Sequence, residues 1–227
     1  MLSPRHAAQF ADTGALHLAA ALDAPALHDL TAALSGHAPA QAGTRLHGVA
    51  GLTPWLAHDG PVGRAAAAVL GRAARPVRAV YFDKTTQANW AVPWHQDRTI
   101  VVRDRIDVAG FGPWTIKGGL QHVAPPIEVL ARMVTLRVHL DAVPDGNAPL
   151  LIAPGSHRLG RIPEADVPNV VARCGTVICR AEPGDIWLYA TPILHASEPS
   201  VQPGHRRVLQ VDFAADGLPG GLEWLGV

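Results

Sequence analysis

The sequence predicts a mainly β domain, a β-sandwich or jelly roll with N-terminal helices packed on one of its sheets. Three observations support this fold class. Apolar residues recur at helical spacing within the first 75 residues, short strand-like runs separated by turn-forming residues begin at Pro76, and two of those runs alternate between apolar and polar side chains. Because the helices come first and the strands afterwards, we expect a single α+β domain.

The length and composition of the chain fit this expectation. The 227 residues lie within the range that one β-rich domain fills, and 48% of them are hydrophobic, which is enough for a sizeable core. We therefore expect residues 1–227 to form one domain, with a helical N-terminal part over 1–75 and a β core over 76–227.

Two helices are predicted in the N-terminal part. Pro25 suits a first helical turn, and Leu27, Leu30 and Leu34 follow it at helical spacing. A second apolar stripe, with the spacing i, i+3, i+4, i+7 and i+8, consists of Val62, Ala65, Ala66, Val69 and Leu70. Residues 36–51 form a polar, glycine-containing connection between the two helices.

The β part is expected to consist of short strands. They are predicted near residues 77–83, 91–97, 99–103, 132–141, 149–153, 175–181, 185–190 and 205–214. Short helical turns are predicted near residues 126–131 and 163–171.

Two of the predicted strands have one apolar face and one polar face. In residues 133–141 the apolar face carries Val134, Leu136, Val138 and Leu140, and the polar face carries Thr135, Arg137, His139 and Asp141. In residues 206–213 the apolar face carries Leu209, Val211 and Phe213, and the polar face carries Arg206, Gln210 and Asp212. We expect the apolar faces to pack beneath the N-terminal helices and the polar faces to line a cavity. The alternative, which is common in antiparallel sheets, is that the polar faces meet solvent.

Charge and targeting signals argue against several classes of protein. Lys and Arg together number 19, as do Asp and Glu, and no basic patch indicates nucleic-acid binding. The first 20 residues do not resemble a signal peptide, and no apolar stretch reaches about 18 residues, so no transmembrane helix is predicted.

Cys174 and Cys179 fall on opposite faces of a strand-like segment, which disfavours a disulfide between them. Two reduced thiols are typical of a cytoplasmic protein.

The most distinctive local pattern is Trp94-His95-Gln96-Asp97. In a strand, His95 and Asp97 project to the same face, so an imidazole nitrogen and a carboxylate oxygen lie next to each other. His195 is the best candidate for a third ligand from elsewhere in the fold. Two histidines and one carboxylate leave three positions of an octahedron free, which is the arrangement of non-haem iron(II) oxygenases. The absence of thiolate ligands argues against structural zinc.

A single His-x-Asp pattern is weak, because it arises by chance and the chain has 12 histidines. Arg206 strengthens it, because an arginine beside a metal can bind the distal carboxylate of 2-oxoglutarate through two parallel hydrogen bonds. Ser197 is a further hydrogen-bond donor to that carboxylate. The alternative for Arg206 is a solvated basic residue.

Taken together, these motifs and their neighbours resemble the phytanoyl-CoA dioxygenase family of iron(II)- and 2-oxoglutarate-dependent oxygenases. The motifs that carry the resemblance are Trp94-His95-Gln96-Asp97, Pro154-Gly155-Ser156-His157, Pro183-Gly184-Asp185, His195-Ala196-Ser197 and Arg206-Arg207-Val208-Leu209. Their order and separation match the family over most of the chain after about residue 76. The sequence departs from the family at Asn147-Ala148, where relatives usually have glycine after the asparagine.

The resemblance implies a double-stranded β-helix, a jelly-roll variant that holds the metal between its sheets. It implies that His95, Asp97 and His195 bind iron(II), and that Arg206 and Ser197 bind 2-oxoglutarate. Three further residues fall near positions that contact co-substrate or substrate in relatives, namely Gln96, Trp114 and Lys84. Their alternatives are a surface or sheet-face position for Gln96, a core position for Trp114 and a surface position for Lys84. Because Asp97 is present, the related halogenases, in which a small residue replaces the carboxylate, are disfavoured.

The predicted activity is hydroxylation of a small organic molecule, with dioxygen and 2-oxoglutarate as co-substrates and succinate and carbon dioxide as products. The alternatives are desaturation or cyclisation by the same cofactor chemistry, and a non-catalytic jelly-roll binding module. We expect the glycine-rich residues 106–126 to close over the substrate. Side chains that are candidates to meet an anionic substrate are Arg103, Arg105, Lys117 and Arg137. Neither a nucleic acid nor a membrane is predicted as a partner.

Overall fold

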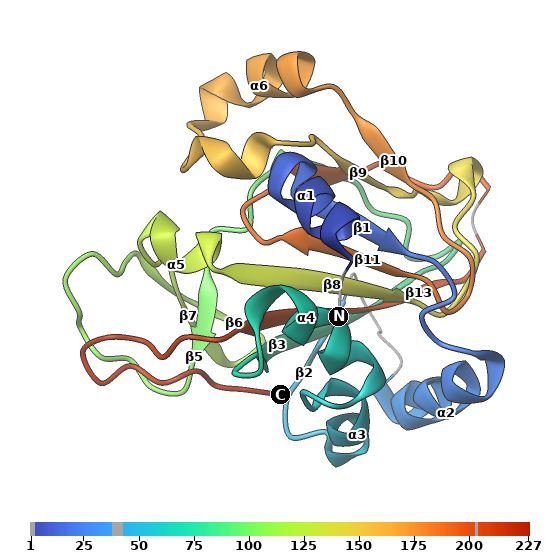
Figure 1. The fold of residues 1–227 in the computed structure, drawn as a ribbon, viewed down its shortest axis with the longest axis horizontal. Coiled ribbons are helices and arrows are strands. Elements are labelled where there is room, and N and C mark those ends of the chain that lie inside the picture. Colours follow the sequence, from blue (N-terminus) through green and yellow to red (C-terminus); the bar gives the residue numbers. More distant parts are fainter. Residues whose placement is uncertain (1–2, 38–42, 203) are drawn as a thin grey trace.

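Two antiparallel sheets face each other in the computed structural model, which describes residues 3–37, 43–202 and 204–227 (Figure 1). The larger sheet contains, in spatial order, β1 (Ala15–Leu18), β11 (Ile186–Ala190), β8 (Met133–His139), β13 (Arg206–Ala214), β3 (Arg75–Lys84) and β2 (Thr44–Leu46). The smaller sheet contains β10 (Val177–Cys179), β9 (Leu150–Ile152), β12 (His195–Ser197) and β4 (Val92–His95). A third sheet, at one side of the molecule, contains β5 (Ile100–Val102), β7 (Leu120–Val123) and β6 (Trp114–Lys117). The predicted fold class is confirmed.

The α-helices lie outside the sheets. They are α1 (Pro4–Thr13), α2 (Ala24–Leu34), α3 (Thr53–Leu56), α4 (Pro61–Leu70), α5 (Ile127–Ala131) and α6 (Val167–Cys174). Helix α2 begins as the sequence predicts, because Pro25 lies in its first turn and the Asp23 side chain accepts a hydrogen bond from the Ala26 N–H at 2.9 Å. Helix α4 matches the second predicted apolar stripe and ends at Gly71, which has a φ of 83°.

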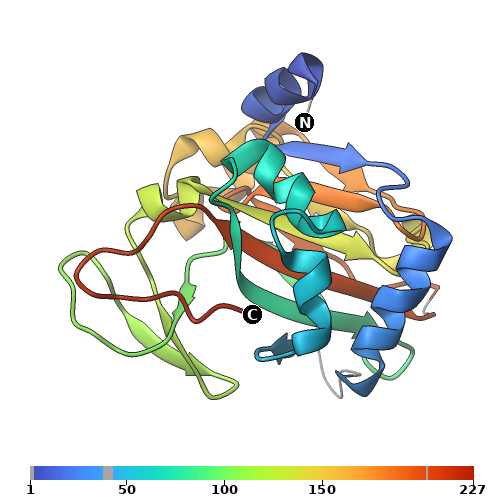
Figure 2. The same ribbon diagram turned by 60° about the horizontal axis from the view of Figure 1, so that its bottom comes forward.

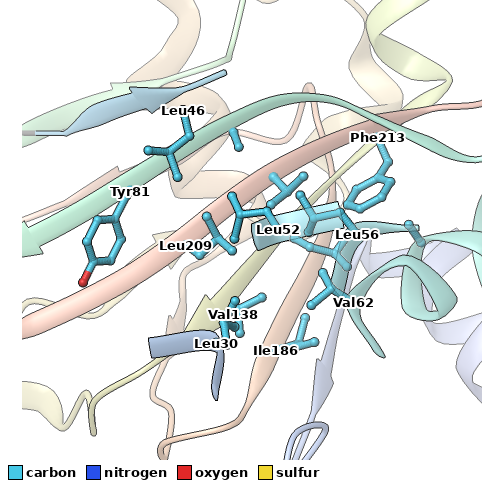
Figure 3. Packing of buried hydrophobic residues seen from close by; sticks show 14 of the residues in the cluster. Leu30, Leu46, Leu52, Leu56, Val62, Tyr81, Val138, Ile186, Leu209 and Phe213 are labelled. Carbon is cyan, nitrogen blue, oxygen red and sulfur yellow. The ribbon is translucent and has the colours of Figure 1, made fainter. Parts of the chain in front are cut away.

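The main hydrophobic core lies between the N-terminal helices and the outer face of the six-stranded sheet. Figure 2 shows α2, α3 and α4 crossing this face. Leu30, Leu52 and Val62 come from the helical side and are almost fully buried, and Figure 3 shows them beside Leu209 and Phe213 of β13. Burial of a side chain of this size contributes roughly 1.5–3 kcal/mol to the stability of the fold. This interface therefore holds the apolar face of the sheet against the helices.

The polar faces of β8 and β13 point to the other side, into the space between the two sheets. Strand pairing aligns Arg137 with Gln210 and Thr135 with Asp212. All four side chains are buried, as is Arg206 at the start of β13. The prediction of an apolar face under the helices and a polar face toward a cavity is therefore confirmed for these residues, and the solvent-facing alternative is wrong for them. Asp141, also predicted on the polar face, lies beyond the end of β8 and its carboxylate binds Arg207 instead.

Five short strands are absent from the sequence-based prediction. Strands β1 and β2 lie within the part predicted to be helical, β6 and β7 lie within the predicted closing loop 106–126, and β12 contains the predicted ligand His195. Each has only three or four residues, too few for a period-2 pattern to be distinguished from a loop. Pairing with segments distant in sequence stabilises three of them: β1 lies beside β11, β2 lies beside β3, and β12 lies between β9 and β4.

The predicted strand 91–97 is shorter in the structure. Strand β4 ends at His95, and Asp97 lies in the irregular segment that follows. Cys174 and Cys179 are both free, in agreement with the prediction that they form no disulfide. Within the described residues, no helix combines the length and the apolar character needed to cross a bilayer.

Candidate active site

Three side chains that can ligate a metal converge between the two sheets. His95, Asp97 and His195 each offer one ligand atom, and these atoms all lie within 4.8 Å of one another. Strand pairing produces the convergence, because β12 aligns His195 directly opposite His95 of β4, with the ring centroids 4.3 Å apart. The register of this strand pair shifts between His195 and Ser197, which indicates a β-bulge next to the site.

Backbone carbonyls orient both imidazole rings. Nδ1 of His95 lies 2.8 Å from the Pro93 carbonyl, and Nδ1 of His195 lies 3.0 Å from the Ile193 carbonyl. Since a carbonyl accepts but does not donate, each Nδ1 carries the proton, and Nε2 keeps its lone pair for a metal. Burial lowers the pKa of His195 to about 4, so its ring is neutral at physiological pH. This donor set fits a divalent transition metal with open coordination positions.

Arg78 of β3 holds the third candidate ligand. Burial would raise the pKa of Asp97, but the Arg78 guanidinium and the two imidazoles keep it below its ordinary value. One Arg78 nitrogen lies 3.5 Å from Asp97 Oδ2, and another lies 2.8 Å from Asp212 Oδ2. Thr135 donates a hydrogen bond to the other Asp212 oxygen at 3.0 Å. This buried chain of contacts keeps the Asp97 carboxylate ionised and oriented.

An inner cavity of about 130 Å³ extends from these ligands toward Arg206. Its polar lining includes Ser197 and Gln210, together with Arg137 and Arg206, which are 6% and 3% exposed. Nη1 of Arg137 donates to Gln210 Oε1 at 2.7 Å, and Nη1 of Arg206 donates to the Ala148 carbonyl. The Nε atom of each arginine is buried without a hydrogen-bond partner among the described residues.

Arg206 lies in a concentration of buried positive charge. Burial and the neighbouring Arg137 lower the pKa of Arg206 to about 9. Lys84, 1% exposed, is paired with Arg206 across β3 and β13, and burial with the two arginines lowers its pKa to about 7. Among the described residues, none of the three forms an ion pair with a carboxylate. Buried cations without counter-ions are costly, so this end of the cavity is suited to an anion.

Two sets of contacts position the residues at this positively charged end of the cavity. Lys84 Nζ donates to Ser197 Oγ at 3.0 Å and to the Glu198 carbonyl at 2.6 Å, which fixes the serine hydroxyl beside the cavity. Ala148 has a φ of 50° in the left-handed region, which favours glycine. A non-glycine residue adopts this conformation at a cost of about 1–2 kcal/mol, and here its carbonyl accepts the hydrogen bond from Arg206.

An outer cavity of about 530 Å³ adjoins the inner one. Phe82, Trp90 and Val92 line both cavities, as do His95 and Asp97. The lining found in the outer cavity alone includes Arg45, Gln96, Arg98, Thr99, Lys117, His122 and Glu164. Its volume lies within the range typical of pockets for small organic ligands.

The structure brings most of the predicted site residues together. Lys84 and Ser197 lie next to Arg206, and Gln96 lines the outer cavity while its side chain is hydrogen-bonded within the protein. Its Nε2 donates to the Gly160 and Pro192 carbonyls at 3.0 and 2.8 Å, and its Oε1 accepts from the Ile162 N–H at 2.9 Å. Gln96 therefore joins the segment between His95 and Asp97 to two loops.

Trp114 is not among the lining residues of either cavity. It lies on the face of the third sheet opposite His122 and packs on a second cluster with Val123 and Leu222, and Arg105 lies over its ring at 5.5 Å. The core alternative considered for Trp114 matches this position. The register of β6 and β7 is the physical reason, because it aligns Trp114 with the buried Val123.

Arg78 and Arg137 are the residues that sequence reasoning placed least well. The sequence predicts that Arg137 lies on the polar face of its strand and is a candidate to contact an anionic substrate. It gives no prediction for Arg78. A signal for Arg78 exists in the sequence, because it shares one face of β3 with Val80, Phe82 and Lys84. Its role nevertheless depends on Asp97 and Asp212, which come from other segments.

The comparisons with known proteins agree with this geometry. The model of the family described as Phytanoyl-CoA dioxygenase (PhyH) matches residues 10–208. No curated protein matches the sequence.

Similar solved structures share the fold. EctD from S. alaskensis in its apoform is 20% identical with a TM-score of 0.72, over 100% of this chain and 81% of that one. AviO1 from Streptomyces viridochromogenes Tue57 is 19% identical with a TM-score of 0.66, over 97% and 98%. The epimerase SnoN is 18% identical with a TM-score of 0.68, over 96% and 90%.

The hydrogen bonds of Gln96 lead to a prediction about stability. Replacement of Gln96 by leucine leaves the Ile162 N–H and two carbonyls without partners, so we expect the free energy of unfolding to fall by about 1–3 kcal/mol. Gln121→Leu is the matched control, because the Gln121 side chain forms no hydrogen bond within the described residues. Chemical denaturation measures both variants. Equal losses of stability would contradict the role assigned to Gln96.

Proposed function

Because this chain belongs to the phytanoyl-CoA dioxygenase family of iron(II)- and 2-oxoglutarate-dependent oxygenases, we propose that it hydroxylates a small organic molecule, with release of succinate and carbon dioxide. The observation that carries the proposal is the position of the three candidate ligands at the inner end of a cavity whose other end has buried, unpaired cations. A non-catalytic binding module does not account for both features. We infer also that residues 1–227 form one oxygenase domain, since β1 and β2 pair within the main sheet.

Iron is assigned to His95, Asp97 and His195. The orientation of both Nε2 atoms and the ionised Asp97 carboxylate support this assignment. When bound, iron supplies the activation of dioxygen that is coupled to oxidation of 2-oxoglutarate. Similar structures agree with the choice of cofactors: SnoN has been solved in complex with Fe3+ and alpha ketoglutarate, and EctD with bound Fe.

The distal carboxylate of 2-oxoglutarate is assigned to Arg206 and Ser197, with Arg137 as an additional cation. The Nε of Arg206 is buried without a hydrogen-bond partner among the described residues and is available to a ligand, while the Ala148 carbonyl fixes its Nη1. Lys84 positions Ser197 and adds positive charge behind it. A dicarboxylate that reaches from the metal ligands to these groups compensates the buried charge, which is the physical reason to expect tight binding.

The protein positions the substrate in the outer cavity. Phe82 and Trp90 lie between the two cavities, so a molecule packed on these rings has part of its surface facing the metal ligands. Exclusion of water by this apolar wall protects the reactive species from side reactions. Hydroxylation requires that one C–H bond of the substrate be held beside the metal.

The hydroxylation proposal is tested by a screen of small molecules for substrate-dependent formation of succinate under labelled dioxygen. We expect a substrate to yield an alcohol that carries one labelled oxygen atom, with the second labelled atom in succinate. Mass spectrometry of both products provides the measurement. A product that has lost two hydrogens and gained no oxygen would contradict hydroxylation while leaving the cofactor assignment intact.

The metal assignment predicts the behaviour of ligand variants. Anaerobic addition of iron(II) and 2-oxoglutarate to the wild-type protein should give a weak visible charge-transfer band, since the bidentate co-substrate needs open metal positions. His95→Ala and His195→Ala should weaken iron binding by more than about 100-fold and abolish the band, because loss of a direct ligand exceeds the effect of losing a residue that only orients one. His28→Ala, at an exposed position of α2, is the control. A band of normal intensity in either ligand variant would refute the assignment.

The co-substrate assignment predicts a change in 2-oxoglutarate affinity. Titration of the same band gives the dissociation constant, and Arg206→Gln should raise it by about 10- to 100-fold, because a charge-assisted hydrogen bond contributes about 1.5–3 kcal/mol. Arg207→Gln is the matched control, since Arg207 forms its ion pair with Asp141 on the other face of β13. An equal affinity in Arg206→Gln and wild type would remove Arg206 from the proposed site.

A further inference from the structure

The outer cavity contains two positive charges that the proposed chemistry does not use. Of its four Lys and Arg residues, Arg78 pairs with Asp97 and Asp212, and Arg98 pairs with Glu164 at 3.3 Å. The remaining two are Arg45 and Lys117. Neither has a carboxylate within 4.0 Å among the described residues.

Arg45 and Lys117 come from different sheets but lie close together. Arg45 belongs to β2 at the edge of the main sheet, and Lys117 ends β6 at the tip of a hairpin. The next residue in the hairpin, Gly118, has a φ of 58°, and a Cβ built on it would lie 3.5 Å from Arg45 Cδ and 3.7 Å from Arg45 Nη1. The side chain of Arg45 therefore extends along the turn that carries Lys117, so two like charges face the same space.

His122 lies at the base of this space. It is 1% exposed, lines the outer cavity and shares a face of the third sheet with Lys117. Burial, followed by the charges of Arg78, Lys117 and Arg45, lowers its pKa to about 4, so the ring is neutral at physiological pH. Its Nδ1 lies 3.5 Å from Thr99 Oγ1, whereas its buried Nε2 has no partner among the described residues. A buried polar atom without a partner is costly and points to a ligand group.

The cavity joins this polar end to the metal ligands through an apolar wall. Val80, Phe82, Trp90 and Val92 line it, and the last three of these also line the inner cavity. A ligand that fills the outer cavity can therefore contact these cations, the aromatic rings of Phe82 and Trp90, and the side chains of the candidate metal ligands that line the same cavity.

We propose that the substrate is a small molecule with an oxyanion, a carboxylate or a phosphate, which Arg45 and Lys117 bind at the outer end of the cavity and to which His122 Nε2 donates a hydrogen bond. Arg45 supplies the forked donors that match two oxygens of one anionic group, and Lys117 supplies a point charge. The body of the substrate packs on Phe82 and Trp90, with the carbon to be oxidised at the opposite end from the anion. This inference rests on the proposed function, of which it names the substrate class.

The test uses probes that share this chemistry. Benzoate and phenyl phosphate carry an oxyanion on an aromatic ring, and benzamide is the uncharged analogue of benzoate. Binding is measured by ligand-observed NMR on anaerobic protein loaded with iron(II) and saturating 2-oxoglutarate, which keeps the inner cavity filled. We expect saturable binding of at least one oxyanion probe and weaker binding of benzamide. Added salt should weaken the binding of the oxyanion, because exposed charges are screened.

Charge variants locate the binding site. Arg45→Gln and Lys117→Gln should each weaken oxyanion binding by about three- to tenfold, since these cations are partly exposed. Arg45→Lys should retain part of the affinity. The matched control is Arg72→Gln, an exposed arginine that is not among the residues lining the described cavities. Three results would overturn the proposal: no saturable oxyanion binding, equal binding of benzoate and benzamide, or equal affinity in the Arg45, Lys117 and Arg72 variants.

This experiment distinguishes a failure of the proposed substrate class from a failure of the proposed metal and co-substrate site. The charge-transfer band in the same samples reports whether iron and 2-oxoglutarate are bound. A band without discrimination between the probes contradicts only the substrate class, whereas discrimination without a band contradicts only the metal and co-substrate assignment.

Discussion

The alternation of side chains across the six-stranded sheet is the constraint on which the rest of the structure depends. Successive residues of β8, β13 and β3 point to opposite faces, so each strand contributes at once to the core beneath the helices and to the interior between the sheets. A shift of one residue in any of these pairings would bury Arg137 or Arg206 among leucines. The apolar face thereby fixes the register, and the register fixes where the charges lie.

The interior that results is polar and buried. Its charges are compensated near the candidate metal ligands but not near Arg206. Near the candidate metal ligands, Arg78 lies between Asp97 and Asp212, so positive and negative charges compensate one another. Toward Arg206 the charges are positive only, and Lys84 contributes to the same excess. The energetic cost of this excess is the physical basis for assigning an anionic co-substrate to that end.

The smaller sheet aligns two of the candidate metal ligands, although its strands are short. Strand β12 has three residues, yet it pairs with β9 on one side and β4 on the other, and it aligns His195 with His95. The carbonyl groups of Pro93 and Ile193, each two residues before its histidine, select the same tautomer in both rings. Gln96 holds the segment that follows β4, so the position of Asp97 depends on side-chain hydrogen bonds where strand pairing has ended.

The sequence by itself predicted the fold class and the two-faced strands, because period-2 alternation is a local property of the chain. Residue chemistry together with the family resemblance of its motifs indicated His95, Asp97, His195 and Arg206 as candidate site residues. The sequence did not determine β1, β2 or β12, which form by pairing with strands distant in sequence. Only the tertiary structure decided that Gln96 is a structural link, that Trp114 packs in a core, and that Arg78 and Arg137 belong to the site. It also decided that Arg45 lies beside the turn carrying Lys117. Each of these outcomes depends on which segments meet in space, and side-chain patterns along one strand do not contain that information.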